Sequence, residues 1–242
     1  MDLPGKTAIV TGGAHRVGGA ISLALAERGC RVVVHFHTSA AQADETASKI
    51  GKLGVECLKI RADLSQHAGI LALFEAIDQV GWSVDILVNS AAIMKADDLL
   101  TADETDWART IDLNLKGAFF CLQQAAVRMQ SQGGLIVNIT DIAGQRPWHR
   151  QPIHSISKAG LEMLTQVAAL KLAPKIRVNA VAPGPVAKPE SMSADRWREI
   201  TNELPLKRGG DSRDVARAVL FLAENDFITG ETLVVDGGNR LL

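Results

Sequence analysis

Short apolar runs alternate with amphipathic stretches along the whole chain. Runs rich in β-branched and aliphatic residues predict seven strands, at residues 6–11, 31–36, 55–60, 85–89, 134–139, 176–181 and 232–235. Apolar residues at helical spacing predict helices at 17–28, 40–53, 66–80, 104–130, 151–172 and 215–223, the fourth bent near Gly117. This β-α-β-α order with continuously apolar strands predicts one α/β domain over residues 1–242, a doubly wound parallel sheet with helices on both faces.

Composition narrows the class of protein. The chain has 242 residues, 47% hydrophobic and 22% charged, with a net charge of -1. No apolar run of about 18 residues and no secretory signal is visible, so we expect a cytoplasmic protein without a membrane partner. Near-zero net charge argues against a nucleic-acid partner. Neither the three cysteines nor the histidines have the spacing of a zinc site, so we expect no metal.

A glycine-rich turn, Thr-Gly-Gly-Ala-His-Arg-Val-Gly-Gly at residues 11–19, follows the first strand and opens the first helix. Glycines permit a tight turn and a close approach of the backbone to a pyrophosphate, while the helix N-terminus offers unpaired amides. This context predicts a Rossmann-like dinucleotide site, with binding residues Gly12, His15, Arg16, Val17 and Gly18.

The end of the second strand indicates which dinucleotide binds. An acidic residue there would hold the ribose 2′-hydroxyl of NAD, but this chain has His37, Thr38 and Ser39. Arg16 and these three side chains are suited to a 2′-phosphate. We therefore expect NADP(H) as the cofactor, with NAD as the alternative.

Several separate motifs in the same order resemble those of the short-chain dehydrogenase/reductase family. They are Thr11-Gly12 with Gly18, Asp63-Leu64, Asn89-Ser90-Ala91-Ala92, Asn114, Lys158, Arg177-Val178-Asn179, Pro183-Gly184 and Asp236-Gly237-Gly238. The resemblance implies that Asp63 and Leu64 contact the adenine, that Asn89 lies beside the adenine ribose, that Lys158 binds the nicotinamide ribose, and that Pro183 and Gly184 line the nicotinamide pocket. Ser90, Ala91 and Val186 are expected to bind the cofactor as well.

Within that family the chain is most similar to pteridine reductases. Arg16 stands where the family usually has a glycine, residues 35–41 are similar to their segment after the second strand, and Asp141 stands where the wider family has its catalytic serine. Thr38 replaces the arginine that pteridine reductases have at that place. The resemblance suggests a pterin-like substrate.

The catalytic motif Tyr-x-x-x-Lys reads His154-Ser-Ile-Ser-Lys158, and the chain contains no tyrosine. Spacing of four places both side chains on one helix face. We expect His154 to replace the phenol as proton donor in reduction of a carbonyl or imine, with Asn114 and Lys158 completing the site. Asp141 favours the imidazolium, whereas the like charge of Lys158 disfavours it. Reduction is then expected to be fastest at mildly acidic pH. The alternative is a catalytically silent relative that only binds nucleotide, in a binding or regulatory role.

Aromatic and basic residues near the expected cleft suggest a small-molecule substrate site at Met94, Arg146, Trp148 and Trp197. Residues 186–206, with a short helix near 194–201, are interpreted as a lid that excludes water. The long helices carry apolar residues on more than one side. The family resemblance implies that they pair subunits, so we expect a homotetramer or homodimer.

Overall fold

The computed structural model describes residues 1–189 and 192–242, and its centre is a parallel sheet of seven strands in the order β3-β2-β1-β4-β5-β6-β7. The strands are β1 (Thr7–Thr11), β2 (Arg31–Phe36), β3 (Cys57–Arg61), β4 (Ile86–Asn89), β5 (Gly134–Ile139), β6 (Ile176–Pro183) and β7 (Thr232–Val235). The predicted doubly wound sheet is therefore confirmed, and each predicted strand is present with its ends shifted by two residues at most.

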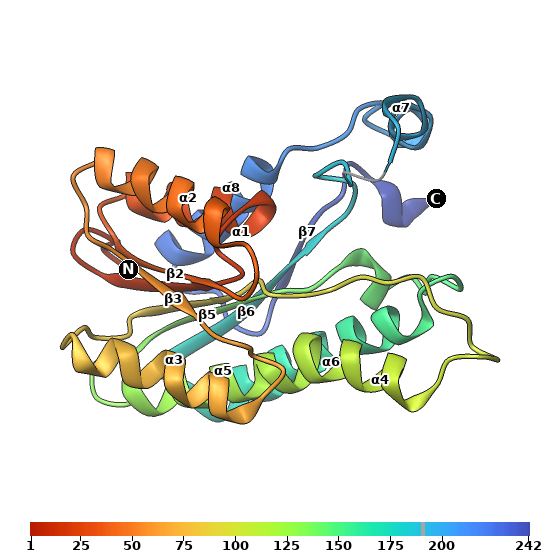
Figure 1. Cartoon of the computed structure of the whole chain (residues 1–242). Helices are drawn as coiled ribbons and strands as arrows, with labels where there is room; N and C mark the ends of the chain where they lie inside the picture. The colour runs from red at the N-terminus through yellow and green to blue at the C-terminus, as the bar shows by residue number, and fades with distance from the viewer. Residues whose placement is uncertain (190–191) are drawn as a thin grey trace.

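Helices cover both faces of the sheet (Figure 1). On one face lie α1 (Arg16–Glu27), α2 (Ala40–Lys52) and α8 (Ser212–Glu224); on the other lie α3 (His67–Gln79), α4 (Glu104–Ile111), α5 (Ala118–Met129) and α6 (Pro152–Leu172). The helix α7 (Ala194–Glu203) stands apart from both layers, near the C-terminus (Figure 1). Two apolar cores fill the spaces between the sheet and its two helical layers. Burial of this apolar surface is the main force that fixes the strand register.

The stretch predicted as one bent helix, 104–130, is a continuous helical segment with a wide turn in the middle. Residues Asp112–Gly117 form a π-helix between α4 and α5. Gly117 does not act as a bend: a Cβ there would lie 2.7 Å from the carbonyl oxygen of Leu64, so glycine permits close packing on the loop after β3. The wide turn carries Asn114, in keeping with the frequent occurrence of π-turns at functional sites.

Helix α8 begins earlier than the periodicity predicts, at Ser212 instead of residue 215. The Asp211 carboxylate accepts from the amide of Arg213, and the Asp214 carboxylate accepts from the amide of Asp211 at 2.8 Å. This capping box stabilises a first turn that contains no apolar residue, which is why the hydrophobic pattern missed it.

The strand order reverses direction at β1, which has β2 on one side and β4 on the other. Loops that leave the carboxyl ends of two such strands diverge to opposite faces and open a crevice. The glycine-rich turn follows β1 and residues 90–93 follow β4, so both border this crevice. Of the predicted lid, residues 186–206, positions 190 and 191 lie outside the described residues. None of the helices in the described ranges is both long and apolar enough to cross a membrane.

The Asp85 carboxylate joins the starts of β1 and β4. It accepts hydrogen bonds from the Thr7 amide at 3.0 Å, the Ser83 hydroxyl at 2.9 Å and the Lys6 ammonium at 3.0 Å, and it is nearly buried. Burial alone would raise the pKa of Asp85, but these hydrogen bonds and Lys6 together lower it below its ordinary value.

We predict that Asp85→Asn lowers the free energy of unfolding by about 1–3 kcal/mol, because the amide cannot accept all three bonds. Because folding lowers the pKa of Asp85, the ionised carboxylate stabilises the folded state at pH values above the aspartate pKa of the unfolded chain. This stabilisation is lost as pH falls through the lowered pKa of the folded state. Urea unfolding at pH 7 and at pH 3 measures this. Glu199→Gln, in an exposed pair with Arg196, is the matched control and is expected to cost less than about 0.5 kcal/mol. Equal losses in the two variants would contradict this account.

Candidate active site and cofactor cleft

A cavity of about 340 Å³ lies at the crevice between β1 and β4. It is lined by most of the residues predicted to bind the cofactor: Gly12, His15, Arg16, Val17, Gly18, His37, Thr38, Ser39, Asp63, Leu64, Ser90 and Ala91. Asn89 lies beneath the cavity, where its amide nitrogen donates to the Ala118 carbonyl and to the Asn138 side chain. The Oδ1 atom of Asn89 is buried without a hydrogen-bond partner among the described residues.

Two glycines shape the wall of this cavity. Gly12 has φ +63°, and a Cβ there would lie 2.9 Å from the Cα of Ala91. A Cβ on Gly18 would lie 2.1 Å from the carbonyl oxygen of Gly12. Side chains at either position would therefore fill the space or push the turn apart. The first turn of α1 has no acidic residue and no side-chain cap, so its amides are free for an anion. These features fit the pyrophosphate of a dinucleotide.

His35 supports the turn from below. Its Nδ1 accepts a hydrogen bond from the Gly12 amide at 3.0 Å, and its Nε2 lies 3.1 Å from the Ala62 carbonyl oxygen, to which it donates. This requires the neutral ring with hydrogen on Nε2. Burial lowers the pKa of His35 to about 4, and the Ala62 carbonyl only partly opposes the shift. Sequence reasoning missed this role, because an alternating histidine in a strand gives no sign of its hydrogen-bond partners.

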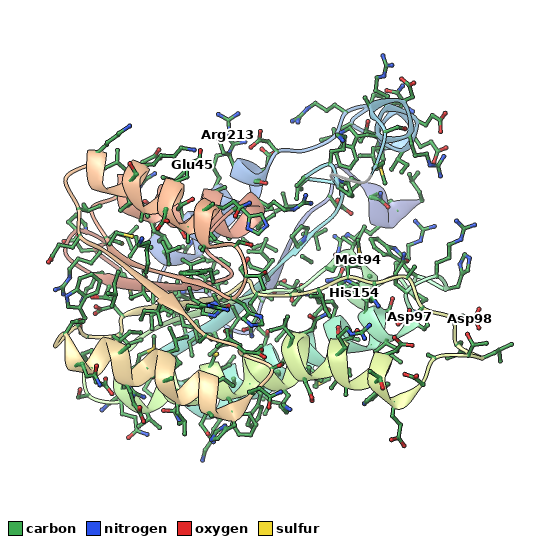
Figure 2. All side chains as sticks on the ribbon, viewed as in Figure 1. Glu45, Met94, Asp97, Asp98, His154 and Arg213 are labelled. Atoms are coloured by element: carbon green, nitrogen blue, oxygen red, sulfur yellow. The ribbon has the colours of Figure 1, made fainter. Side chains whose placement is uncertain are left out.

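A second cavity, of about 600 Å³, opens beside the first. It is lined by Asp141, His154 and Lys158 of the predicted catalytic set, by Pro183, Gly184 and Val186, and by Met94, Trp148 and Trp197. Figure 2 shows Met94 and His154 at the same end of the sheet, beyond the carboxyl ends of the strands. Further lining residues that the sequence did not single out are Ile93, Met192, Ile200 and Asn239. Arg146 is not among them: it is exposed and donates to the Asn239 carbonyl at 3.2 Å.

The orientation of the His154 ring follows from its neighbours. Asn114 directs its amide hydrogens to the Ile93 carbonyl at 2.9 Å and to the Ser157 hydroxyl at 3.2 Å, and its Oδ1 accepts from the Ile93 amide. The Nδ1 of His154 lies 3.2 Å from the Ile93 carbonyl oxygen, to which it donates when it carries a hydrogen, and 3.5 Å from the Asn114 amide nitrogen, from which it accepts in the other tautomer. Asn114 thus holds the backbone of Ile93, and the Ile93 carbonyl in turn contacts the His154 ring.

The other ring nitrogen faces the carboxylate of Asp141. Nε2 of His154 lies 3.6 Å from Oδ2 of Asp141, and it has no hydrogen-bond partner among the described residues. In a neutral ring with hydrogen on Nδ1, the Nε2 lone pair would point toward a negative charge. A hydrogen on Nε2 would instead face a hydrogen-bond acceptor, the Oδ2 atom of Asp141.

Lys158 is buried one helical turn beyond His154. Its ammonium donates to the Ile139 carbonyl at 2.8 Å. Burial lowers the pKa of Lys158 to about 8, and the negative charge of Asp141 acts in the opposite direction. Lys158 is therefore largely charged at neutral pH and loses its charge as pH rises through about 8.

Comparison with known proteins identifies the family. The family model described as Enoyl-(Acyl carrier protein) reductase matches residues 12–240. The 3-oxoacyl-[acyl-carrier-protein] reductase FabG of Staphylococcus epidermidis is 38% identical over 240 residues, covering 96% of this chain and 98% of the relative. Glucose 1-dehydrogenase 2 of Bacillus subtilis is 35% identical and covers 99% of this chain, which covers 96% of that protein. The chain belongs to the short-chain dehydrogenase/reductase family of oxidoreductases, as its motifs predicted.

Solved structures agree with this assignment. FolM alternative dihydrofolate reductase 1 from Brucella canis, crystallised with NADP, superposes with a TM-score of 0.94 at 30% identity, covering 100% of this chain and 96% of that chain. Acetoin dehydrogenase YohF from Salmonella typhimurium superposes with a TM-score of 0.90 at 36% identity, covering 98% and 96%.

We predict that Gly18→Ala reduces binding of NADPH by at least about 100-fold, because the added methyl group would overlap the Gly12 carbonyl and displace the turn. Titration of NADPH fluorescence measures the loss. Gly51→Ala is the control, since a Cβ there meets nothing within 4 Å and the helix α2 gains stability. Normal binding by Gly18→Ala would show that the turn does not hold the cofactor.

We predict that His35 stays neutral in the folded protein until pH falls to about 4. The unfolded chain takes up this proton near pH 6.5, so stability is lost as pH falls from about 6.5 to about 4, by roughly 3 kcal/mol for this group. The measurement is the difference in unfolding free energy between the native chain and His35→Asn, which should shrink across this window. NMR of the imidazole in the native chain gives a second readout, and titration of His35 near pH 6.5 would contradict the prediction.

Proposed function

We propose that this protein is an NADP(H)-dependent reductase of a carbonyl or imine, with the His154–Asp141 pair in place of the tyrosine that acts as proton donor in the family. The observation that carries this proposal is the 3.6 Å approach of the His154 Nε2 to the Asp141 Oδ2 beside a cavity also lined by Lys158 and Pro183. The NADP bound to the FolM structures supports the choice of cofactor.

In this proposal each group of residues has a separate role. NADPH, when bound, supplies the hydride. Gly12, Gly18 and the first turn of α1 hold the pyrophosphate, and Lys158 holds the nicotinamide ribose. Asn114 and the Ile93 carbonyl fix the His154 ring, so that the proton on Nε2 is held toward Oδ2 of Asp141. Asp141 takes up this proton and passes it to the substrate oxygen or nitrogen, which completes the reduction and leaves His154 neutral.

The pair acts as a unit because the two side chains differ in access to the cavity. The Asp141 side chain is 21% exposed, whereas that of His154 is 4% exposed. The substrate therefore meets the pair from the Asp141 side, while His154 behind it stores the proton. In this arrangement Asp141 orients the His154 ring and also passes the proton to the substrate.

A flat, partly apolar substrate suits the second cavity. Trp148 and Trp197 line it together with Met94, and an indole stacks well on a planar heterocycle. The likeness to FolM supports a pterin-like substrate, and the likeness to FabG makes a 3-oxoacyl thioester the competing class. Residues 186–206, which carry Trp197 and Ile200 over this cavity, are proposed to close it against water.

A second function, nucleotide binding without catalysis, is favoured by one observation. Nε2 of His154 is almost inaccessible, so a substrate atom does not reach it without some movement of the Asp141 side chain. Activity restored by His154→Tyr in an inactive native chain would establish this silent alternative.

The assembly proposed is a homodimer or homotetramer. Several large apolar side chains are exposed on α5 and α6, at Phe119, Val127, Ile156, Met163, Val167 and Leu170. An apolar surface of this kind on two adjacent helices favours a partner, and a second copy of the chain is the one the family resemblance implies.

We predict that His154→Ala lowers kcat for NADPH-dependent reduction of a dihydropterin or 3-oxoacyl thioester by at least about 100-fold, with NADPH affinity within twofold of native. Loss of the stored proton is the reason. The kcat of Asp141→Asn should fall by a similar factor. The kcat of the double variant should fall little further, because the two groups act as one unit. His149→Ala, an exposed histidine outside the cavity, is the control. Unchanged turnover in both single variants would overturn the proposed mechanism.

A further inference from the structure

The side chain of Arg61 on β3 places a positive charge beside the loop after β2. The choice between NAD and NADP is usually assigned from the end of β2 alone. Arg61 is the last residue of β3, and its Cα pairs with that of Phe36 at the end of β2. The Nε of Arg61 donates to the carbonyl of His37 at 3.1 Å. The guanidinium therefore lies against the backbone of His37, and neither His37 nor the next two residues, Thr38 and Ser39, have a permanent positive charge.

Alternation along β3 places Arg61 on the α2 side of the sheet. Lys59, two residues earlier, forms an ion pair with Asp44 of α2, so Arg61 projects from the same face. It lies toward the N-terminal end of α2, where Ser39 is the N-cap residue. The first turn of α2 contains no acidic residue, and Ser39 makes no side-chain capping bond. The amides of the first turn of α2 and the guanidinium of Arg61 thus both lie at the loop after β2.

The nearby carboxylates are already engaged elsewhere. Asp44 pairs with Lys59, and Asp63 accepts from both the amide and the hydroxyl of Ser65. Within residues 1–189 and 192–242, the two Nη groups of exposed Arg61 have no hydrogen-bond or ion-pair partner. They are free to bind an anion in the bidentate manner that phosphate favours.

Arg16, the cation predicted from the sequence, is committed differently. Its Nη1 and Nη2 donate to the carbonyls of Lys188 and Ala187, at 3.2 and 3.1 Å. Arg16 thus links the glycine-rich turn to the start of the 186–206 segment. Arg16 lines the cofactor cavity, and so do His37, whose carbonyl accepts from Arg61, and Asp63, two residues after Arg61.

We propose that Arg61 binds the 2′-phosphate of NADP and is the main determinant of the preference for NADP over NAD. It supplies from β3 the charge that pteridine reductases have at the position of Thr38. This inference rests on the proposed function for its cofactor, and concerns the adenosine end alone.

The test measures binding, not turnover. Calorimetric titration of the full chain with NADPH and NADH gives their affinity ratio for the native protein, Arg61→Gln, Arg61→Lys and Arg109→Gln. Arg109 is a distant arginine in an exposed pair with Asp106, so its variant is the matched control for loss of one charge. We expect Arg61→Gln to weaken NADPH binding by at least about tenfold and to leave NADH within twofold, because only the phosphate contact is lost. Arg61→Lys should retain part of the preference, and Arg109→Gln all of it.

Two smaller probes remove the nicotinamide from the comparison. Adenosine 2′,5′-bisphosphate should lose affinity in Arg61→Gln, while 5′-AMP should not. Equal weakening of both probes would assign Arg61 a structural role and overturn the inference. Native protein that prefers NADPH, with Arg61→Gln that keeps this preference, would overturn the inference and leave the proposed function intact. Native protein that binds NADH as well as NADPH would overturn the cofactor assignment itself, and the inference with it.

Discussion

The cofactor cleft depends on one buried, neutral imidazole. His35 connects the glycine-rich turn after β1 to the end of β3, since it accepts from the Gly12 amide and donates to the Ala62 carbonyl. A charged ring could not accept from Gly12, and burial keeps the ring uncharged. The turn, the loop after β2 and the end of β3 are thereby held in one arrangement. The cavity lies among these three segments, so its shape follows from this pair of hydrogen bonds.

Most of the fold could be predicted because most strands are apolar on both faces and each helix has one apolar side. Seven parallel strands and the site at the switch between β1 and β4 followed from this pattern and from the position of the glycines. The misses were local. The start of α8 depends on a capping box of polar residues, and the wide turn at Asn114 depends on tertiary packing around Gly117. Hydrophobic periodicity contains neither kind of information.

The residues of the candidate site could be predicted from the sequence, but the hydrogen bonds between them could not. Motif spacing named Asn114, Asp141, His154 and Lys158, and the last three line one cavity. It could not reveal that Asn114 acts on Ile93, or that the Arg146 side chain turns to the C-terminal segment. The position of Arg61 beside the loop after β2 could not be predicted, because it depends on the pairing of β2 with β3 in the sheet. Contacts between strands that are distant in sequence have no local signature.

Replacement of a phenol by an imidazole changes what the rest of the site must provide. A phenol has one oxygen and is neutral when it carries its proton, so a nearby lysine suffices to make it acidic. An imidazole has two nitrogens, and it donates well only as a cation. In the proposed mechanism the Ile93 carbonyl holds one nitrogen in place, and Asp141 supplies the counter-charge that the cation needs. A serine at position 141 would leave the imidazolium beside Lys158 without any compensation. The proposed mechanism therefore requires Asp141 and His154 together, because each residue supplies what the other lacks.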